Sequence, residues 1–400
     1  MSLEIALSGI NAVNAQLGTI SDNIANSGTY GFKSSRANFA STYAGTQATG
    51  VEVASNTQSI GRSGGTVTTG RALDAAIQGR GFFITHDSTG TVAYTRVGIF
   101  STDKNGVLVD SFGRRVQGYA AVNGTGSTTT RGALGDITVP TGQIAAKASD
   151  TLQYVGNLSS GWTAPTAAFD PTDPTTFNGS SVSTVYDSLG EKHTLTQYFV
   201  KTGASAVTVH YGLDGTMLAD TGALAFDNNG ALTSSTLSSG GTALSLGTPI
   251  GAAALSIKLD YTGTTQFAGD TTTTVNSSNG YASGALTGVS LQDNGDVLAT
   301  YSNGQKQAVG TIALANFPNE DGLIPVSATS WVDSPASGTA LISAPGTGLA
   351  GTLSAGSLEQ SNVDMTAELV NLMTAQRNYQ ANTKVISTEG QVIQALMQAV

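Results

Sequence analysis

The side chains best suited to chemistry in this chain of 400 residues are one serine, three histidines and a few aspartates. Ser63 lies in the segment GRSGG, which fits the nucleophile-elbow pattern G-x-S-x-G. That pattern needs a strand before the serine and a helix after it, because the sharp turn between them exposes the hydroxyl. A run of Gly, Ser and Thr surrounds Ser63 instead, so a chance match explains the segment better than a hydrolase does.

The histidines do not suggest a metal or catalytic set. His86, His193 and His210 are far apart in the sequence, and none has a second histidine at the spacing of metal ligands. Each lies in a strand-like segment. We expect all three to be packed or solvated strand residues.

Two acidic segments and one Gly-rich segment are also weak candidates. Asp103 with Asn105, and Asp227 with Asn229, resemble fragments of calcium loops, but the glutamate at the twelfth position is missing, so turns explain them better. QGRGFF (78–83) precedes a strand pattern and lacks the third glycine and the helix of a dinucleotide site. We therefore expect no enzymatic activity, no metal and no cofactor.

The composition excludes several classes of partner. With 17 Lys and Arg against 27 Asp and Glu, the net charge of −10 offers no attraction for nucleic acid or anionic lipid. The chain has no cysteine, which removes disulfides and thiolate chemistry. No apolar run approaches the length of about 18 residues that suggests a membrane span, so no membrane insertion is expected. The first basic residue is Lys33, so an ordinary signal peptide is not expected either.

Both ends of the chain carry an apolar stripe at the spacing of a coiled-coil helix. The first stripe comprises Leu3, Ala6, Ile10, Val13, Leu17, Ile20 and Ile24. The second recurs every seven residues at Leu358, Met365, Leu372, Tyr379, Ile386, Ile393 and Val400, supported by Leu369, Ala375, Val385, Val392 and Leu396. SNVD (361–364) indicates a capping box at the start of the second helix, with Asp364 reaching back to the amide of Ser361.

Two interpretations of these helices are open: a buried pair within one domain, or surfaces for the same helices of neighbouring subunits. Their lengths, roughly 33 Å and 55 Å at 1.5 Å per residue, do not allow them to cover each other fully. Gly9, Gly18 and Gly390 each cost about 1 kcal/mol relative to Ala, so such helices are marginal alone in water. Because the helices lie at the two extremes of the chain, we favour neighbouring subunits as the source of their stability.

The long segment between the stripes is typical of β-structure. Asn-Gly turns between short alternating apolar runs predict hairpins in FSTDKNGVLVD (100–110), LAFDNNGALTSS (224–235) and VSLQDNGDVLATYSNGQKQAVGTI (289–312). We predict two β-domains, sandwich- or barrel-like, so that the fold class is mainly β with α-helical termini. A Pro- and Thr-rich stretch places one boundary near residue 147, and the return falls near residue 281.

The segment SDNIANSGTYGFKS (21–34) predicts how the first helix ends. The apolar stripe stops after Ile24, and the asparagine and glycines that follow supply turn and positive-φ positions. The aromatic residues, Tyr30 and Phe32 and then Phe39 and Tyr43, are expected to anchor the chain. We therefore predict an ordered connector over residues 25–70 rather than a flexible linker. The residues that we assign to it, including Asn23 just before this range, are Asn23, Asn26, Gly28, Tyr30, Gly31, Phe32 and Lys33.

The sequence resembles the bacterial flagellar axial proteins, the family of rod and hook subunits. ALSGINAVNAQLGTISDNIANSGTYGFKSSRANFA is similar to the N-terminal signature of the family, with N-I-A-N at Asn23 to Asn26 and G-F-K at Gly31 to Lys33. SLEQSNVDMTAELVNLMTAQRNYQANTKVI is similar to its C-terminal counterpart, with the core Gln376, Arg377, Tyr379 and Gln380. LDAAIQGRGFF, YTRVGIFSTDKNGVLVDSFGRRVQGY and IALANF resemble the β-domain of rod and hook subunits. VYDSLGEKHTLTQYFVK (185–201) resembles the outer domain of hook subunits.

The resemblance implies a nested domain order. Residues 1–24 and 357–400 form a helical inner tube, and residues 25–70 the connector. Residues 71–146 and 281–356 form the β-domain shared with rod proteins, and residues 147–280 an outer β-domain.

The resemblance also implies a hook subunit, which polymerises helically into a flexible tube that transmits motor torque from rod to filament. The expected partners are copies of the same chain, rod, hook-cap and hook–filament junction proteins and the flagellar export apparatus. The expected location is extracellular, in the flagellum, without a cleaved signal peptide. The alternatives are a distal-rod subunit, which has the same ends and a shorter middle, and a secreted β-rich adhesin, which the terminal heptads disfavour.

Overall fold

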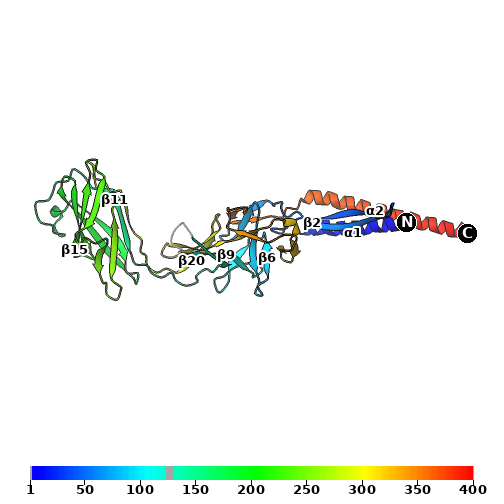
Figure 1. Cartoon of the computed structure of the whole chain (residues 1–400), viewed down its shortest axis with the longest axis horizontal. Coiled ribbons are helices and arrows are strands. Elements are labelled where there is room, and N and C mark those ends of the chain that lie inside the picture. The colour runs from blue at the N-terminus through cyan, green and yellow to red at the C-terminus, as the bar shows by residue number, and fades with distance from the viewer. Residues whose placement is uncertain (1, 123–129, 400) are drawn as a thin grey trace. The chain divides into compact units, whose positions relative to one another are not determined.

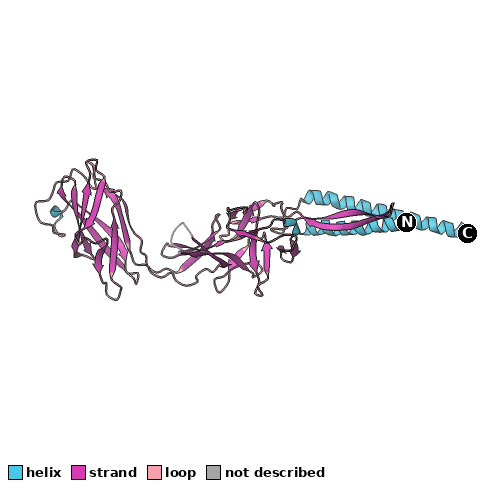
Figure 2. Cartoon of the chain, in the orientation of Figure 1, coloured by secondary structure: helices cyan, strands magenta, loops and turns pink. Residues whose placement is uncertain are grey.

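Helices occupy the two ends of the chain and strands occupy the middle (Figures 1 and 2). The computed structural model describes residues 2–122 and 130–399. Helix α1 spans Ser2–Ala25 and helix α2 spans Met365–Ala399. The predicted fold class, mainly β with helical termini, is confirmed.

The chain divides into two compact units. The first unit contains Met1–Thr141, Thr287–Thr300 and Lys306–Val400, and so holds both helices. The second unit contains Gly142–Leu286 and Tyr301–Gln305. The second unit is therefore an insertion in the sequence of the first.

A long β-hairpin follows α1. Strand β1 (Ser35–Ala44) pairs antiparallel with β2 (Gln47–Gln58), and both strands pack against α1. The register shifts at Asn38/Phe39 and at Thr42/Tyr43, as it does at β-bulges, which bend a strand pair and increase its twist. The central part of the predicted connector is thus regular structure that lies on the first helix.

The body of the first unit is one large sheet, in the order β20-β21-β22-β9-β5-β6-β25-β24, with five further strands paired at its sides. Its strands are β5 (Phe82–His86), β6 (Val92–Thr95), β7 (Phe100–Thr102), β8 (Leu108–Asp110), β9 (Arg115–Val122), β10 (Thr130–Asp136), β20 (Leu286–Leu291), β21 (Asp296–Tyr301), β22 (Lys306–Ile312), β23 (Leu314–Asn316), β24 (Ile324–Val326), β25 (Ser330–Val332) and β26 (Leu341–Ser343). Phe82 and Tyr94 each contact Phe317 edge to face, and Phe82 also contacts Trp331, in the core of this unit.

Two short sheets join the start and the end of the first unit. Strand β3 (Thr66–Thr68) pairs with β28 (Ser357–Glu359), and β4 (Ala75–Gln78) pairs with β27 (Thr352–Ala355). The segment that leads into α2 therefore lies beside the segment that leaves the hairpin. This pairing places residues from opposite ends of the sequence in one small region.

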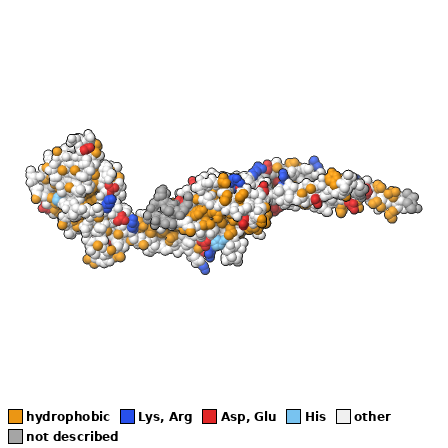
Figure 3. Space-filling model, in the orientation of Figure 1, with side chains coloured by type: hydrophobic (Ala, Val, Ile, Leu, Met, Phe, Trp, Pro, Cys, Tyr) orange, Lys and Arg blue, Asp and Glu red, His pale blue; other side chains and the backbone are white. Residues whose placement is uncertain are grey.

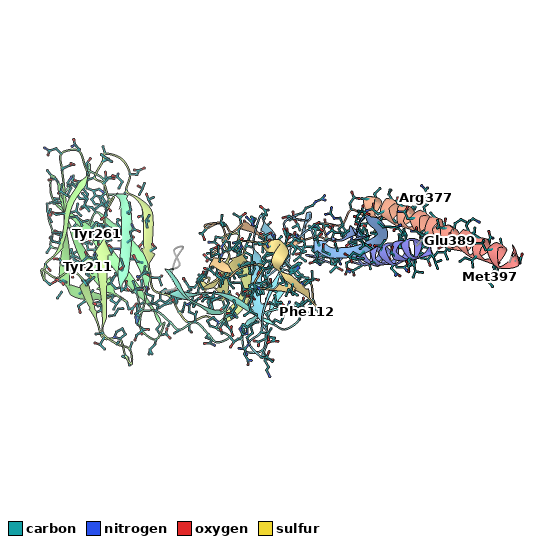
Figure 4. All side chains as sticks on the ribbon, turned by 45° about the vertical axis from the view of Figure 1, so that its right-hand side comes forward. Phe112, Tyr211, Tyr261, Arg377, Glu389 and Met397 are labelled. Carbon is teal, nitrogen blue, oxygen red and sulfur yellow. The ribbon has the colours of Figure 1, made fainter. Side chains whose placement is uncertain are left out.

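The second unit packs two sheets around one core. Its five-stranded sheet runs in sequence order through β12 (Gly179–Tyr186), β13 (Lys192–Gly203), β14 (Ala206–Leu213), β15 (Thr216–Phe226) and β16 (Leu232–Leu237). Its four-stranded sheet has the order β17 (Leu244–Gly247), β18 (Leu255–Asp260), β11 (Thr151–Asn157) and β19 (Thr272–Ser278). The hydroxyls of Tyr211 and Tyr261, one from each side of this core, lie 3.1 Å apart (Figure 4).

The predicted hairpins are confirmed, and their turns explain the apparent calcium-loop fragments. Asp103 Oδ1 accepts from the amides of Asn105 and Val107, each at 2.8 Å, between β7 and β8. Asp227 Oδ1 likewise accepts from the amides of Asn229 and Ala231, between β15 and β16. These carboxylates organise turns, which is the role that their local sequence favours.

Among the described residues, neither helix has both the length and the mean hydropathy of a membrane span.

Candidate assembly surface

Helix α1 buries much of its predicted stripe. Ala6, Val13 and Ile20, spaced seven residues apart, are less than one-tenth exposed. The remaining members are half-buried at Ile10, Leu17 and Ile24, and exposed at Leu3 near the end of the helix. The stripe faces α2 and the hairpin, so two neighbouring elements of the same chain cover it.

The two helices form an antiparallel pair. Val13, Ile20 and Ala375 make a small buried cluster, against which Leu372 packs. Further along, Gly9 faces Asn382: a Cβ at position 9 would lie 2.9 Å from Asn382 Nδ2. Part of the stability that the sequence analysis assigned to neighbouring subunits therefore comes from within the chain, because the hairpin gives α1 a second partner.

Helix α2 nevertheless leaves most of its apolar side chains uncovered. The predicted stripe residues that lie between 38% and 62% exposed are Met365, Leu369, Tyr379, Val385, Val392, Ile393 and Leu396. Val370, Met373 and Met397 are also exposed, whereas Ile386 is half-buried. Figure 3 shows hydrophobic side chains at the free end of α2. A protein seldom leaves so many apolar side chains of one helix in water without a partner.

The prediction that Leu358 belongs to the second helical stripe is wrong. Leu358 lies in β28 and is 3% exposed, because the chain pairs with β3 before the helix begins. Residues 357–364, predicted to be helical, are therefore a strand and a short extended segment.

The predicted capping box is also wrong. Asp364 is itself the residue before α2, and its Oδ1 accepts from the amides of Thr366 at 3.0 Å and Ala367 at 3.1 Å. A carboxylate at this position satisfies free helix amides directly, so no contact back to Ser361 is needed.

Asn23 and Gly31 organise the turn after α1. Asn23 is 1% exposed; its Oδ1 accepts from the amide of Ser35, and its Nδ2 donates to the Ser35 carbonyl, both at 2.8 Å. Asn23 Nδ2 also donates to Glu368 Oε1 at 3.0 Å, which ties the end of α1 to β1 and to α2. Gly31 has φ +69°, and a Cβ there would lie 3.1 Å from the backbone of Arg96. Asn26 stays local: its Nδ2 donates to the carbonyl and carboxylate of Asp22.

The aromatic anchors predicted for the connector are wrong in three of four positions. Tyr30, Phe39 and Tyr43 are 36%, 40% and 64% exposed, and Phe32 is half-buried. Gly28, also predicted to be special, has open space at its Cβ position and needs no positive φ. The segment is ordered through buried polar side chains instead.

Lys33 is the centre of those buried contacts. Its Nζ donates to Glu359 Oε1 at 2.7 Å and to the carbonyl of Arg62 at 2.8 Å. Arg96 approaches the other carboxylate oxygen at 3.3 Å, and the amide of Gly64 donates to Oε1 at 2.9 Å. The three charged side chains are each about 1% exposed, so we call Lys33, Arg96 and Glu359 the buried ion cluster.

Burial sets the electrostatics of this cluster. Loss of solvent lowers the pKa of Lys33 and the pKa of Arg96, and the charge of Glu359 opposes both shifts. Glu359 is the carboxylate that both cations contact, and the charge of Glu320 adds a smaller effect of the same sign. Because Lys33 precedes β1, Arg96 follows β6 and Glu359 ends β28, the cluster joins both terminal segments to the β-body.

Sequence reasoning missed Arg96, Glu359 and Asn362. Asn362 Oδ1 accepts from the amide of Ser34 at 2.7 Å, and its Nδ2 donates to the carbonyls of Ser59 and Arg62. Such polar residues belong neither to an apolar stripe nor to a catalytic motif. The available signal was that Glu359 and Asn362 lie in SLEQSN, within the C-terminal segment that resembles the axial family.

The weak catalytic candidates stay apart. Ser63 lies in an irregular segment between β2 and β3, without the strand-to-helix turn of a nucleophile elbow. His86 pairs with Asp136, His193 with Asp214, and His210 stacks on Phe169, so each histidine is a packed strand residue. In the described part of the chain, no group of three His, Cys, Asp or Glu residues is placed to hold a metal ion.

Four family models match successive parts of the chain. They are the flagella basal body rod protein (residues 3–33), the flagellar hook protein FlgE/F/G D1 domain (76–154), the flagellar basal body protein FlaE D2 domain (157–281) and the flagellar basal body rod FlgEFG protein C-terminal segment (354–399). The terminal helices, the connector and the β-body thus define a protein of the flagellar rod and hook class.

Full-length relatives identify the family within this class. The chain is 41% identical to the flagellar hook protein FlgE of Salmonella typhimurium, over 99% of both chains, and 39% identical to that of Escherichia coli K12 over the same shares. It is 34% identical to that of Brucella abortus, over 99% of this chain and 98% of the relative. The chain belongs to the flagellar hook protein FlgE family, and its function is that of a hook subunit.

A solved structure shares the fold. The flagellar hook protein FlgE2 of Helicobacter pylori superposes with a TM-score of 0.54 at 14% identity, over 74% of this chain and 99% of that one. At this identity the likeness concerns the fold alone.

Proposed function

We propose that this chain polymerises helically with copies of itself into the flexible tube of the hook, which transmits motor torque from rod to filament. The observation that carries the proposal is the uncovered apolar surface of α2, from Met365 to Met397, beside a partly buried α1. A neighbouring subunit that covers this surface supplies the burial that the single chain lacks.

The domain order of the proposal follows the nested sequence, with one correction. The helical inner part consists of α1 and α2, the connector of residues 25–70, the shared β-domain of 71–146 and 281–356, and the outer domain of 147–280. Residues 357–364 belong to the connector rather than to the helix. The outer-domain insertion and the full-length hook relatives favour a hook subunit over a distal-rod subunit.

The proposed partners are rod, hook-cap and hook–filament junction proteins at the two ends of the tube, and the flagellar export apparatus before assembly. We further propose an extracellular location in the flagellum and no enzymatic role. The last point accords with the pairing of all three histidines to structural partners.

The proposal accounts for the weak charge of the chain. Charged residues make up 11% of it, which leaves few ion pairs to break when outer domains of neighbouring subunits move past one another. Hook bending stiffness should then change little between low and high salt. A stiffness that falls steeply with added salt would contradict this part of the proposal.

Limited proteolysis before and after assembly tests the main proposal. Purified subunits are digested as monomers and again after high sulfate has driven assembly, with electron microscopy of the second sample. We expect high sulfate to produce tubes. We also expect the protease to cleave the end of α2 in monomers, and this cleavage to be suppressed in tubes. Subunits that form no tube, or helices equally resistant in both states, would contradict polymerisation through these helices.

A further inference from the structure

The first unit contains a groove whose walls come from α1, α2 and the hairpin. Its volume is about 560 Å³, and its lining includes Ile5, Val13, Phe39, Val51, Ala381 and Asn382. Two of these, Ile5 and Phe39, are about 40% exposed although both are large and apolar. The groove is thus an open apolar site, continuous with the contact between the two helices.

The same chain carries a helical segment whose described apolar side chains are largely exposed. The antiparallel pair aligns Gly9 with Asn382, so the last turns of α2 run beyond the start of α1. Figure 1 shows the C-terminal end of α2 past the N-terminal end of α1, and Figure 4 labels Met397 in that part. In residues 391–398, which we call the α2 extension, Val392, Ile393, Leu396 and Met397 are 47% to 76% exposed.

We propose that the α2 extension of one subunit occupies the groove of the next subunit. This inference rests on the proposed function, since it names the contact through which the subunits polymerise. The extension cannot reach the groove of its own chain, because α2 is one continuous helix from Met365 to Ala399. Ala381 in the groove and Leu396 in the extension are fifteen residues apart, about 22 Å along that helix at 1.5 Å per residue.

The two surfaces match in chemistry. The groove is lined by apolar residues, glycines and amide side chains, and the amides belong to Gln16, Asn378 and Asn382. The extension reads QVIQALMQ, which combines apolar residues with glutamines. Neither surface has to bury an ionised group, which would carry a large desolvation cost, and amides on both sides are able to hydrogen-bond.

The arrangement also explains why the assembly is open. A knob and a hole at different places on one molecule make a heterologous contact, which repeats into a filament or tube unless the rotation closes it.

Paired cysteines test the contact cleanly, because the natural chain has none. In the variant A381C/L396C an intrachain disulfide is excluded, since disulfides need Cα atoms about 4.4–6.8 Å apart. After assembly under reducing conditions and mild oxidation, we expect a ladder of covalent dimers, trimers and longer chains on denaturing gels. The matched control is A381C/M373C, which also joins Ala381 to an exposed apolar position of α2, but outside the extension.

The outcomes separate this inference from the proposed function. If tubes of A381C/L396C give no more disulfide-linked oligomers than tubes of the control, the proposed contact of the α2 extension is wrong. Hook polymerisation would still hold, and a different protein would be the candidate ligand of the groove. Wild-type subunits that form no tube would instead contradict the proposed function. If A381C/L396C does not assemble, A48C/L396C probes the groove from its hairpin wall, and absence of a ladder in its tubes counts equally against the contact.

Discussion

Lys33 and Glu359 lie 326 positions apart in the sequence, yet Lys33 Nζ is 2.7 Å from Glu359 Oε1 and both side chains are buried. The contact joins the segment between α1 and β1 to β28, the strand that precedes α2. Both helices therefore leave the β-body from one point, which Arg96 also contacts. The buried ion cluster therefore links both helical segments to that body.

Glu359→Gln should destabilise the first unit by about 3–5 kcal/mol, because it removes the carboxylate that both buried cations, Lys33 and Arg96, contact directly. Urea unfolding followed by the fluorescence of Trp331 measures this, in a Trp162→Phe background that silences the second unit. The control is Arg115→Met, which breaks a half-exposed pair with Asp136 and should cost at most about 1 kcal/mol. Equal effects of the two substitutions would contradict the role assigned to the buried ion cluster.

Local pattern predicted the parts of this protein that depend on local physics. The heptad spacing of Val13 and Ile20 gave α1, and Asp103 with its Asn-Gly neighbours gave a hairpin, because each signal lies within a few residues. Leu358 fitted the heptad equally well and lies in a strand. Its pairing with β3, almost three hundred residues away, overrode the local pattern.

The candidate surface was only partly predictable for the same reason. The stripes predicted which apolar residues form helical surfaces. They did not predict which of these residues are buried within a single chain. That division depends on the hairpin packing against α1, as seen at Ala6, which is buried, and at Leu396, which is exposed. Buried charges such as Glu359 look like surface residues in a sequence, because their partners are distant in it.

Ile20→Ala and Ile393→Ala should separate monomer stability from assembly. Ile20 is 4% exposed in the small helix cluster, so its truncation should cost about 2 kcal/mol or more and lower the thermal midpoint of monomer helicity by circular dichroism. Ile393 is 47% exposed, so its truncation should leave the monomer within about 0.5 kcal/mol. It should instead raise the subunit concentration needed for tube formation. Monomers of Ile393→Ala that melt as early as those of Ile20→Ala would argue against an uncovered surface.

Gly18→Ala and Gly9→Ala should have different effects although both glycines lie within α1. Position 18 has no atom within 4 Å of a new Cβ, so the better helix propensity of Ala should stabilise the helix by about 1 kcal/mol. At position 9 the new Cβ lies 2.9 Å from Asn382 Nδ2, so displacement of that side chain should cancel the gain. Thermal unfolding of the monomers measures both, and Gly9→Ala with Asn382→Ala should recover the stabilisation. A full gain from Gly9→Ala alone would show that α1 and α2 do not pack closely there.

The pKa values of the three histidines should be shifted in two directions, up for two of them and down for the third. Both ring nitrogens of His86 face acceptors, Asp136 Oδ1 at 2.7 Å and the Asp87 carbonyl at 2.9 Å, and only an imidazolium donates from both. The hydrogen bond to Asp136 raises the pKa of His86, and that to Asp214 raises the pKa of His193, whereas burial lowers the pKa of His210.

The stability contribution of His86 and His193 is therefore fully present below the unfolded value near 6.5 and is lost as pH rises through the higher folded pKa. His210 has the opposite sign: its neutral form contributes stability above about 6.5, and this is lost as pH falls toward its lower folded pKa. Titration of the imidazole protons by NMR should place His86 and His193 above 6.5 and His210 below it. His86→Gln and His193→Gln should each reduce the loss of stability on the alkaline side, and His210→Gln should not. A folded His86 that titrates at or below 6.5 would mean that its contact with Asp136 is absent in solution.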